Sequence, residues 1–258
     1  MDITKKIVIM VTGCHAQPDN YKECERTWIP KLRELGFKVL ISLGSTEVDK
    51  NGVLTLNDFE NYFKFLDKNT IEFRTFDSKL GLFDKSIKLP SKWVLNETDY
   101  EYYFRIDSDS FVHPERFKKM LEDNLKDFPD LDYMGGGHPN FGYNPHYYFT
   151  KIICRTGFFA SGCGYLVSKR GMKIALDKMK IQQKCDFEMD DLVLGRAMWE
   201  SRVPLLHDSR ICFESNYVKL AFDPHNIGIP DISELNSHLA IQHYMNGYME
   251  ETMKKLNL

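Results

Sequence analysis

The sequence lacks a long hydrophobic run, a paired-cysteine motif and a surplus of basic residues. Its early apolar run, residues 7–11, is far shorter than the ~20 residues of a membrane-spanning helix or the ~7–15 of a signal-peptide core. We therefore expect no membrane anchor and a cytoplasmic location. The six cysteines contain no Cys-x-x-Cys pair, which argues against a zinc module. With 34 Lys and Arg against 37 Asp and Glu, the net charge of −3 argues against nucleic-acid binding.

The composition is that of a folded protein. Of 258 residues, 43% are hydrophobic and 28% are charged, which is enough apolar material for a real core. The length predicts one domain or at most two.

Strand-like and helix-like segments alternate along the chain, which predicts an α/β layer fold with a largely parallel sheet. Strands are predicted over residues 7–12, 37–43, 70–76, 100–106, 131–134, 164–167 and 203–207. Helices are predicted over 20–35 with a break near Pro30, 58–67, 80–96 with a break near Pro90, 114–125, 169–179, 190–201 and 239–255. Residues 45–57 and 138–156 are expected to be irregular.

The strand predicted over residues 100–106 runs directly into Asp107-Ser108-Asp109. Ligands of α/β sheets bind at the carboxyl ends of the strands, and two carboxylates one residue apart can reach one hard cation. Oxygen ligands suit Mg²⁺ or Mn²⁺, which would neutralise a diphosphate. The alternative is a solvated turn, which is the commoner fate of an isolated Asp-x-Asp.

Two later segments also carry candidate residues. Ser161, Gly162 and Cys163 belong to a run of small residues before a strand, where a backbone can approach a ligand closely; the alternative is a plain glycine-rich turn. Asp190 and Asp191 open a predicted helix. They either complement the helix dipole, or one of them is a general base whose pKa is separated from that of its neighbour.

Near the end of the chain, His238 and His243 are candidate metal ligands, although a surface or capping position is the alternative. The aromatic residues between 141 and 149 are a candidate platform for sugar rings or a loop packed on its own side chains.

The order of these segments resembles that of the GT-A glycosyltransferases, which use nucleotide-sugar donors. Residues 26–28, 103–112, 159–168 and 190–195 are similar to the Fringe and β1,3-galactosyltransferase group, glycosyltransferase family 31. The resemblance extends over residues 7–245.

The resemblance implies a GT-A type α/β fold, a single Rossmann-like domain over residues 1–258 with a mostly parallel central sheet. Residues 1–112 would form the donor half and 113–258 the acceptor and catalytic half. The implied reaction is a metal-dependent, inverting transfer from a UDP-sugar to a hydroxyl of a glycan or glycoprotein, usually with a β1,3 linkage.

It also implies particular functions for the candidate residues. Asp107 and Asp109 would bind Mn²⁺ or Mg²⁺, and Asp191 would be the catalytic base, with Asp190 its close rival. The residues implied to contact the nucleotide sugar are Thr12, Gly13, Arg26, Asp107, Ser108, Ser161, Gly162 and Cys163.

The sequence departs from the group in two ways. The stretch 208–215 has no His where the group carries one, so His243 is the first substitute as third metal ligand. The group is normally Golgi-resident with an anchor and stem, and this chain shows neither. A retaining transferase, an inactive sugar-nucleotide-binding module and a metal-dependent nucleotidyltransferase or phosphohydrolase remain as alternatives.

Overall fold

The computed structural model describes residues 2–47, 62–78, 81–139, 151–154, 158–179, 190–208, 210–212, 240–242 and 247–258, called the described residues below. Among them, nine strands form one sheet and three short strands form a second. No helix within these ranges is long and apolar enough to cross a bilayer.

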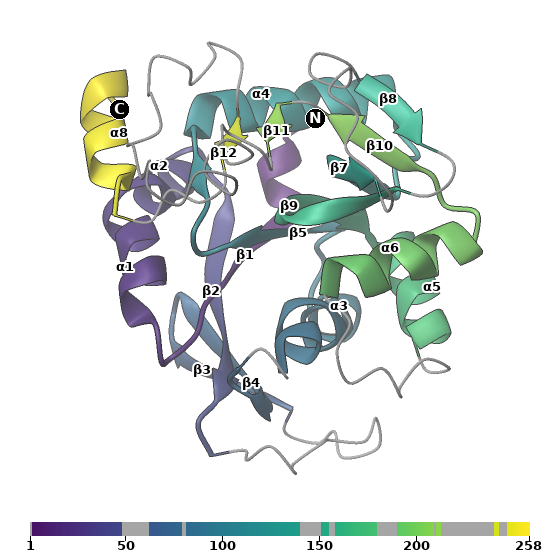
Figure 1. Ribbon diagram of the computed structural model, residues 1–258, viewed down its shortest axis with the longest axis horizontal. Coiled ribbons are helices and arrows are strands. Elements are labelled where there is room, and N and C mark those ends of the chain that lie inside the picture. The colour runs from purple at the N-terminus through teal and green to yellow at the C-terminus, as the bar shows by residue number, and fades with distance from the viewer. Residues whose placement is uncertain are drawn as a thin grey trace, which may run out of the picture.

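The main sheet has the strand order β3-β4-β2-β1-β5-β9-β7-β10-β8 (Figure 1). Its strands are β1 (Ile7–Thr12), β2 (Lys38–Ser45), β3 (Phe63–Asp67), β4 (Thr70–Phe76), β5 (Tyr102–Asp107), β7 (Tyr133–Pro139), β8 (Lys151–Cys154), β9 (Phe158–Ser168) and β10 (Leu205–Asp208). Strands β3, β8 and β9 run opposite to the other six. The expected α/β class with a mostly parallel sheet is therefore confirmed.

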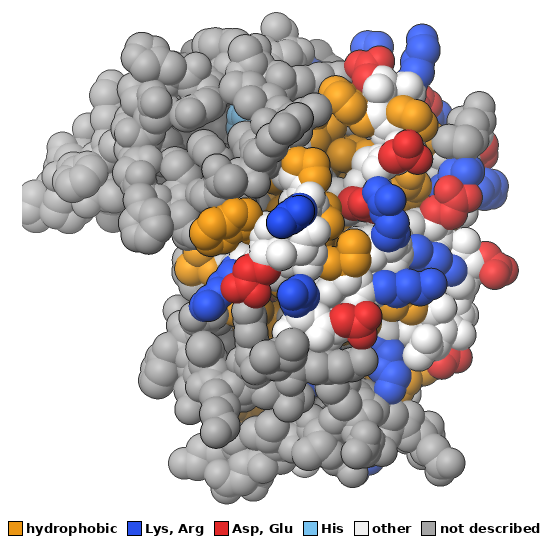
Figure 2. All heavy atoms as spheres, turned by 90° about the vertical axis from the view of Figure 1, so that its right-hand side faces the viewer, with side chains coloured by type: hydrophobic (Ala, Val, Ile, Leu, Met, Phe, Trp, Pro, Cys, Tyr) orange, Lys and Arg blue, Asp and Glu red, His pale blue; other side chains and the backbone are white. Residues whose placement is uncertain are grey.

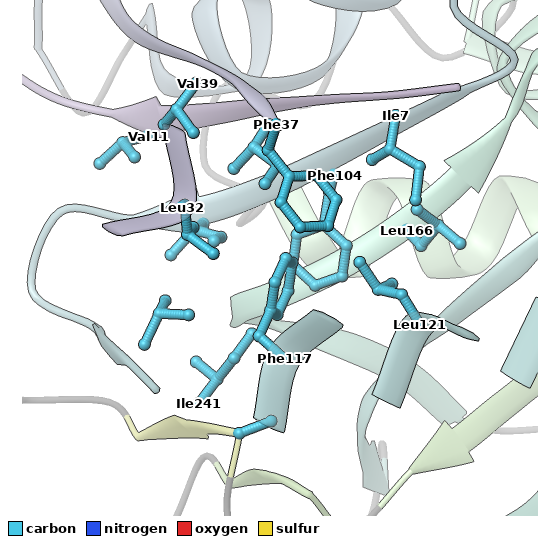
Figure 3. Packing of buried hydrophobic residues seen from close by; sticks show 14 of the residues in the cluster. Ile7, Val11, Leu32, Phe37, Val39, Phe104, Phe117, Leu121, Leu166 and Ile241 are labelled. Carbon is cyan, nitrogen blue, oxygen red and sulfur yellow. The ribbon is translucent and has the colours of Figure 1, made fainter. Parts of the chain in front are cut away.

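Helices cover both faces of the sheet (Figure 1). One face packs on α1 (Pro18–Arg26), α2 (Trp28–Glu34), α4 (Pro114–Asp127) and α8 (Met249–Leu256). The other packs on α3 (Leu89–Glu97), α5 (Lys169–Met179) and α6 (Asp190–Glu200). In the first core, the rings of Phe104 and Phe117 meet edge to face with centroids 4.9 Å apart (Figure 3). On the side that carries α5 and α6, charges of both signs are interspersed (Figure 2).

The interior strand β1 is buried along its whole length, as expected for a parallel strand with helices on both faces. It pairs with β5 so that Thr12 lies opposite Asp107. This register places the carboxyl ends of the two strands side by side. The acidic pair that follows β5 therefore begins at the edge of the sheet where α/β proteins bind ligands.

Strand β9 is longer than the strand predicted over 164–167 and runs antiparallel between β5 and β7. Gly135 of β7 pairs with Tyr165 and Gly137 pairs with Ala160, so two steps along β7 match five along β9. Extra residues in one strand form a bulge, a feature common beside active sites. The bulge lies in the small-residue run that includes Gly162.

The helix predicted over residues 58–67 is wrong in its described part, because Phe63–Asp67 is strand β3. Phe63 and Phe65 are two residues apart, so in a strand they share one face. Their rings lie 6.4 and 6.1 Å from that of Trp93 on α3. This shared packing partner favours the extended conformation over a helical one.

Two other helix predictions need correction. The helix expected over 20–35 breaks at Thr27, not at Pro30, because Pro30 lies in the first turn of α2, where no backbone N–H is needed. Of residues 239–255, only those from Met249 onward are helical among the described ones.

Short strands replace parts of the segments expected to be helical or irregular. Strand β12 (Ile241–Gln242) lies between β11 (Ile211–Cys212) and β6 (Phe111–Val112) in the second sheet. Strand β8 lies within residues 138–156, expected to be irregular, and pairs with β10. In both cases pairing with a distant strand decides the conformation.

Candidate functional site

The candidate site begins at the end of β5 with a buried ion pair. Arg105 is only 1% exposed, and its Nη2 lies 2.6 Å from Oδ1 of Asp107. The two residues are two apart in a strand, so their side chains lie on the same face of the sheet. A buried guanidinium requires counter-charges, and Asp107 supplies one at the edge of the sheet.

The start of α6 supplies the second counter-charge. Nη2 of Arg105 lies 3.1 Å from Oδ2 of Asp190. The same carboxylate oxygen accepts a 2.6 Å hydrogen bond from Oγ of Ser86. Nη1 of Arg105 donates to the carbonyl oxygen of Gly162 at 2.5 Å. Arg105 therefore joins β5, β9 and α6 at one point.

Asp191 is held differently from its neighbour Asp190. Its carboxylate accepts hydrogen bonds from the backbone N–H groups of Gly162, at 3.2 Å, and of Leu192, at 2.8 Å. Burial, joined by the charge of Asp190, raises the pKa of Asp191 from its ordinary 3.8 to about 6, while the Arg105 guanidinium acts in the opposite direction. The two neighbouring carboxylates thus have distinct environments, and Asp191 suits proton transfer near neutral pH.

Gly162 connects these groups because it has no side chain. A Cβ at this position would lie 2.4 Å from Oδ2 of Asp107 and 2.5 Å from Nη1 of Arg105. Its neighbours Ser161 and Cys163 are buried and contact each other, with Oγ and Sγ 2.8 Å apart. The small-residue run predicted from the sequence thus approaches Asp107 and Arg105 closely.

The chemistry around Asp107 and Asp109 fits a hard cation. Mg²⁺ and Mn²⁺ are commonly held by one or two carboxylates together with substrate phosphates and water. The buried hydroxyls of Thr12, opposite Asp107, and of Ser110 have no hydrogen-bond partner among the described residues. Oxygen atoms that could act as metal ligands are therefore present at the ends of both β1 and β5.

The expected third ligand, His243, lies outside the described residues, as does His238. Within the described ranges, no group of three or more His, Cys, Asp or Glu side chains is placed to hold a metal. The chain does return to this region, since Gln242 pairs with Phe111, two residues after Asp109. The aromatic residues 141–149 also lie outside the described part.

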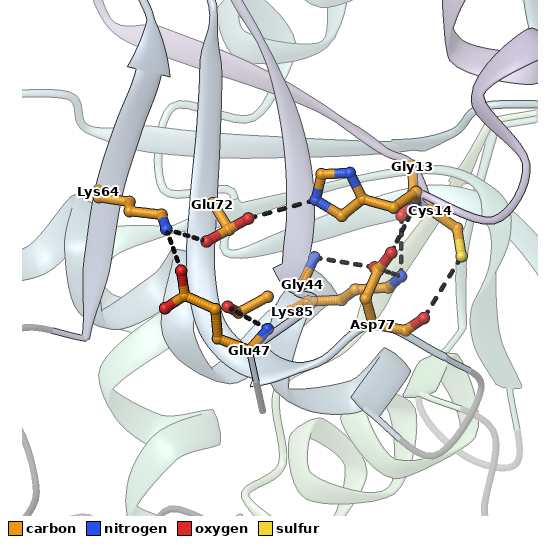
Figure 4. A network of polar contacts seen from close by, with 10 residues as sticks. Gly13, Cys14, Gly44, Glu47, Lys64, Glu72, Asp77 and Lys85 are labelled. Carbon is orange, nitrogen blue, oxygen red and sulfur yellow. Dashed lines mark hydrogen bonds and ion pairs between the residues drawn. The ribbon is translucent and has the colours of Figure 1, made fainter. Parts of the chain in front are cut away.

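A second polar network lies at the carboxyl ends of β1, β2 and β4 (Figure 4). Nζ of Lys85 contacts Oδ1 of Asp77 at 2.6 Å and the carbonyl oxygen of Gly13 at 2.8 Å. Asp77 also accepts from the backbone N–H groups of Gly44, at 2.9 Å, and His15, at 2.5 Å. This buried network fixes the loop after β1, where the resemblance places part of the nucleotide.

The two networks meet in one turn of helix. Lys85 and Ser86 are consecutive residues of a π-helical turn, Asp84–Lys88, which leads into α3. Lys85 belongs to the network around Asp77, and Ser86 donates to Asp190. Single π-helical turns are frequent at functional sites. Here the turn places two successive side chains in two different parts of the site.

The two remaining predicted nucleotide contacts are Arg26 and Ser108, and the contacts of both involve α1. Arg26, at the end of α1, is exposed, and its Nε lies 3.3 Å from Oε1 of Glu250 on α8. Ser108 lies between the two aspartates, and its carbonyl oxygen accepts a hydrogen bond from Sγ of Cys24 at 3.2 Å. The structure thus brings together Thr12, Gly13, Asp107, Ser161, Gly162, Cys163, Asp190 and Asp191, but not Arg26.

Arg105 and Ser86 contact the candidate residues but were missed by sequence reasoning. Arg105 carried a signal, because it is a charged residue within an otherwise apolar strand just before an acidic pair. Ser86 carried none, since its partner Asp190 is 104 positions away.

No protein-family model and no curated protein matches the chain. By structure it is similar to a glycosyltransferase involved in the glycosylation of the major capsid of PBCV-1, with 11% identity, coverage of 97% of this chain and 98% of that one, and a TM-score of 0.52. It is also similar to the glycosyltransferase GlyE of Streptococcus pneumoniae TIGR4, with 15% identity and a TM-score of 0.45, over 93% of this chain but only 54% of that one. The first likeness shows a shared fold, which agrees with the GT-A type expected from the sequence.

Proposed function

We propose that the protein is a metal-dependent, inverting glycosyltransferase that moves a sugar from a UDP-sugar to a hydroxyl of a glycan or glycoprotein. The observation that carries the proposal is the pair of hydrogen bonds made by Gly162. Its N–H donates to Asp191, and its carbonyl oxygen accepts from Arg105, which pairs with Asp107. Gly162 thus connects Asp191, whose pKa is raised, to the carboxyl end of β5, where we propose that the diphosphate binds.

Asp191 would act as the general base. Its carboxylate takes the proton from an acceptor hydroxyl, whose oxygen attacks the anomeric carbon on the face opposite the departing UDP. The new bond therefore forms with inversion. A base works best with a pKa near the working pH, and the pKa of about 6 meets this condition. Asp190 is held by Arg105 and Ser86, so Asp191 is the better candidate of the two.

Asp107 and Asp109 would hold Mn²⁺ or Mg²⁺, with His243 as the proposed third ligand. The cation would stabilise the negative charge on the leaving diphosphate. Within the chain, Arg105 holds one oxygen of Asp107 and Gly162 packs against the other, which orients the carboxylate before any ligand binds. The loop fixed by Asp77 and Lys85 would support the nucleotide.

The kinship with the Fringe group and the β1,3 linkage rest on the sequence resemblance. Linkage analysis of the product tests the latter directly. A retaining enzyme would give the opposite anomer, and an inactive binding module would bind UDP without turnover.

The first experiment is a panel of UDP-sugars with Mn²⁺ and with a chelator, scored by UDP release and by the product anomer. We expect turnover of at least one donor with metal, and its loss with chelator. Asp191→Asn should lower turnover by about 10²–10⁴-fold while UDP still binds, because the general base that activates the acceptor hydroxyl is lost.

The matched control is Asp132→Asn. Asp132 belongs to the second Asp-x-Asp of the sequence but pairs with Arg170 and Ser168, away from the site. This variant should keep wild-type turnover. Near-wild-type activity of Asp191→Asn would refute its assignment as the base, and binding of no UDP-sugar under any metal would refute the transferase.

A further inference from the structure

We infer that Arg105 is a positioning residue that fixes the predicted metal-binding carboxylate Asp107 and, through Asp190, the start of the helix that carries the base. The inference rests on the proposed function and deepens it. The resemblance assigns no function to this position, and the polar contacts of the residue are with Asp107, Asp190 and Gly162, so it would act through them.

The contacts of Arg105 extend in three directions. Nη2 forms ion pairs with Oδ1 of Asp107 at 2.6 Å and with Oδ2 of Asp190 at 3.1 Å. Nη1 donates a hydrogen bond to the carbonyl oxygen of Gly162 at 2.5 Å. The guanidinium also lies over the Tyr165 ring, with Cζ 5.6 Å from the centroid. A planar fork can hold acceptors in several fixed directions at once, whereas an ammonium acts as a point charge.

These contacts set the orientation of Asp107. Oδ1 is taken by Arg105, and Oδ2 faces the backbone of Gly162, where an added Cβ would lie 2.4 Å away. A carboxylate that binds metal is usually oriented by such a hydrogen-bonded partner, and loss of the partner costs ~10–100-fold in metal affinity or activity. Arg105 has the position of such a partner.

The same side chain acts on α6. Asp190 is the first residue of this helix, and Asp191, the proposed base, is the second. The pair between Arg105 and Asp190 connects the start of α6 to β5. Arg105 also donates a hydrogen bond to the carbonyl oxygen of Gly162, and the N–H of Gly162 donates to Asp191. Movement of Arg105 would therefore displace the metal carboxylate and the base together.

The chain contains a matched control for this arrangement. Arg210 also joins two aspartates, with Nη2 2.7 Å from Asp208 and Nη1 3.0 Å from Asp123 on α4. Asp208 is 1% exposed and also accepts from Asn124. This second unit ties the end of β10 to α4, which packs on the opposite face of the sheet from α6.

The test compares Arg105→Lys with Arg210→Lys. Calorimetry measures Mn²⁺ binding in the presence of UDP, and steady-state kinetics give kcat and KM for transfer. We expect Arg105→Lys to weaken Mn²⁺ binding ~10–100-fold and to lower kcat about 10²-fold by misplacing the base, with a smaller change in KM for the acceptor. Arg210→Lys should leave Mn²⁺ binding and kcat unchanged, and it should lower Tm by less than Arg105→Lys does, because the Arg210 side chain is 19% exposed and that of Arg105 only 1%.

A second variant, Asp190→Asn, separates the two connections and serves if Arg105→Lys fails to fold. It weakens the tie to α6 but keeps the pair between Arg105 and Asp107. We expect it to lower kcat while Mn²⁺ binding stays within about twofold.

The outcomes separate this inference from the proposed function. If Arg105→Lys matches Arg210→Lys in Mn²⁺ binding and kcat, or if Asp190→Asn leaves kcat unchanged, Arg105 is merely structural and the inference is overturned while the transferase stands. If the wild-type protein binds Mn²⁺ with UDP but transfers no sugar, selective loss of that binding in Arg105→Lys still supports the position of Arg105 in the metal site. Absence of Mn²⁺ binding in the wild type would overturn both.

Discussion

At the scale of single residues, Asp190 and Asp191 are adjacent in the chain, but their carboxylates have different hydrogen-bonding partners. Asp190 contacts a guanidinium and a hydroxyl, whereas Asp191 accepts from backbone N–H groups. Adjacent residues of one type can in this way carry out separate tasks, one holding the site together and the other available for proton transfer.

The raised pKa of Asp191 predicts the pH dependence of transfer. The proposed base, Asp191, must be ionised to accept a proton, so kcat/KM should fall about tenfold per pH unit below an acidic limb near pH 6. In Asp190→Asn the limb should move to lower pH, because the charge of Asp190 raises the pKa of Asp191. Rates measured from pH 4.5 to 8 check this, and a limb unchanged by that substitution would contradict the coupling.

The same shift predicts an effect on stability. The pKa of Asp191 is higher in the folded protein than its ordinary 3.8, so between pH 3.8 and about 6 the native state binds more protons and stability falls as pH rises. Asp191→Asn removes this cost and should stabilise the protein at pH 8 by about 1–3 kcal/mol. Denaturant unfolding at pH 8 and pH 4 measures it, and an equal gain at both would argue against a buried charge.

The close contact at Gly162 predicts the effect of a single methyl group. In Gly162→Ala the new carbon would collide with Asp107 and Arg105, at 2.4 and 2.5 Å. Both are held by further contacts, so we expect Mn²⁺ binding in the presence of UDP to weaken at least ~10-fold. Calorimetry checks the loss, and unchanged binding would show that Asp107 can adjust.

Whether a candidate residue could be predicted from the sequence depends on how far along the chain its partners lie. Asp107 and Asp109 could be singled out because they follow a strand directly, and Asp190 and Asp191 because they open a helix. Arg105 was missed because it contacts Gly162 and Asp190, which lie 57 and 85 positions further along the chain. Such pairings are set by the register of the sheet, which periodicity alone does not fix.

At the scale of elements, the position of α6 depends on one close contact with β9. A Cβ on Gly195 would lie 2.2 Å from Cβ of Phe159, so Gly195→Ala should push the helix from the sheet. We expect a loss of about 1–3 kcal/mol in stability and a lower kcat, because Asp191 moves with the helix. Thermal unfolding and kinetics measure both.

The control for this variant is Arg196→Ala, at the next position of the same helix, where the side chain is 51% exposed. It should change stability by less than about 0.5 kcal/mol and leave kcat unaltered. Equal kcat in the two variants would show that α6 tolerates the displacement.

The elements that could be predicted are those with a strong internal pattern. Strands β1 and β4 and helix α5 have the predicted bounds, because a β-branched buried run and an amphipathic helix each encode their own conformation. Strand β3 was misassigned because its aromatic residues find Trp93 only in the tertiary structure. The direction of β9 was missed for the same reason, since its neighbours β5 and β7 are distant in sequence.

At the scale of the whole molecule, the site joins residues from both halves of the chain. Arg105 and Asp107 belong to the first 112 residues, whereas Gly162, Asp190 and Asp191 come from the rest. Ligands that bind where these parts meet should therefore stabilise the entire fold. The likeness to a solved glycosyltransferase at 11% identity agrees with an arrangement set by the alternation of strands and helices more than by particular residues.

Ligand-induced stabilisation gives a prediction at this scale. Mn²⁺ with UDP at about 100 times its Kd should stabilise the protein by about 2.7 kcal/mol, which corresponds to about 5–10 °C in Tm for a domain of this size. Chelator, or the substitution Asp109→Asn, should abolish the shift. Differential scanning fluorimetry measures it, and a shift that persists with chelator would place UDP binding outside the metal site.

The central position of β9 has a consequence for how the protein is made. Strands β5 and β7 are synthesised before it, yet neither pairs with the other, and both await the strand that completes the sheet between them. Until the ribosome has released residue 168, each presents an open backbone edge, the kind of surface that invites association between nascent chains. Pairing over such distances is slow to form. The carboxylates at the end of β5 therefore acquire their surroundings only after β9 and the start of α6 have been synthesised.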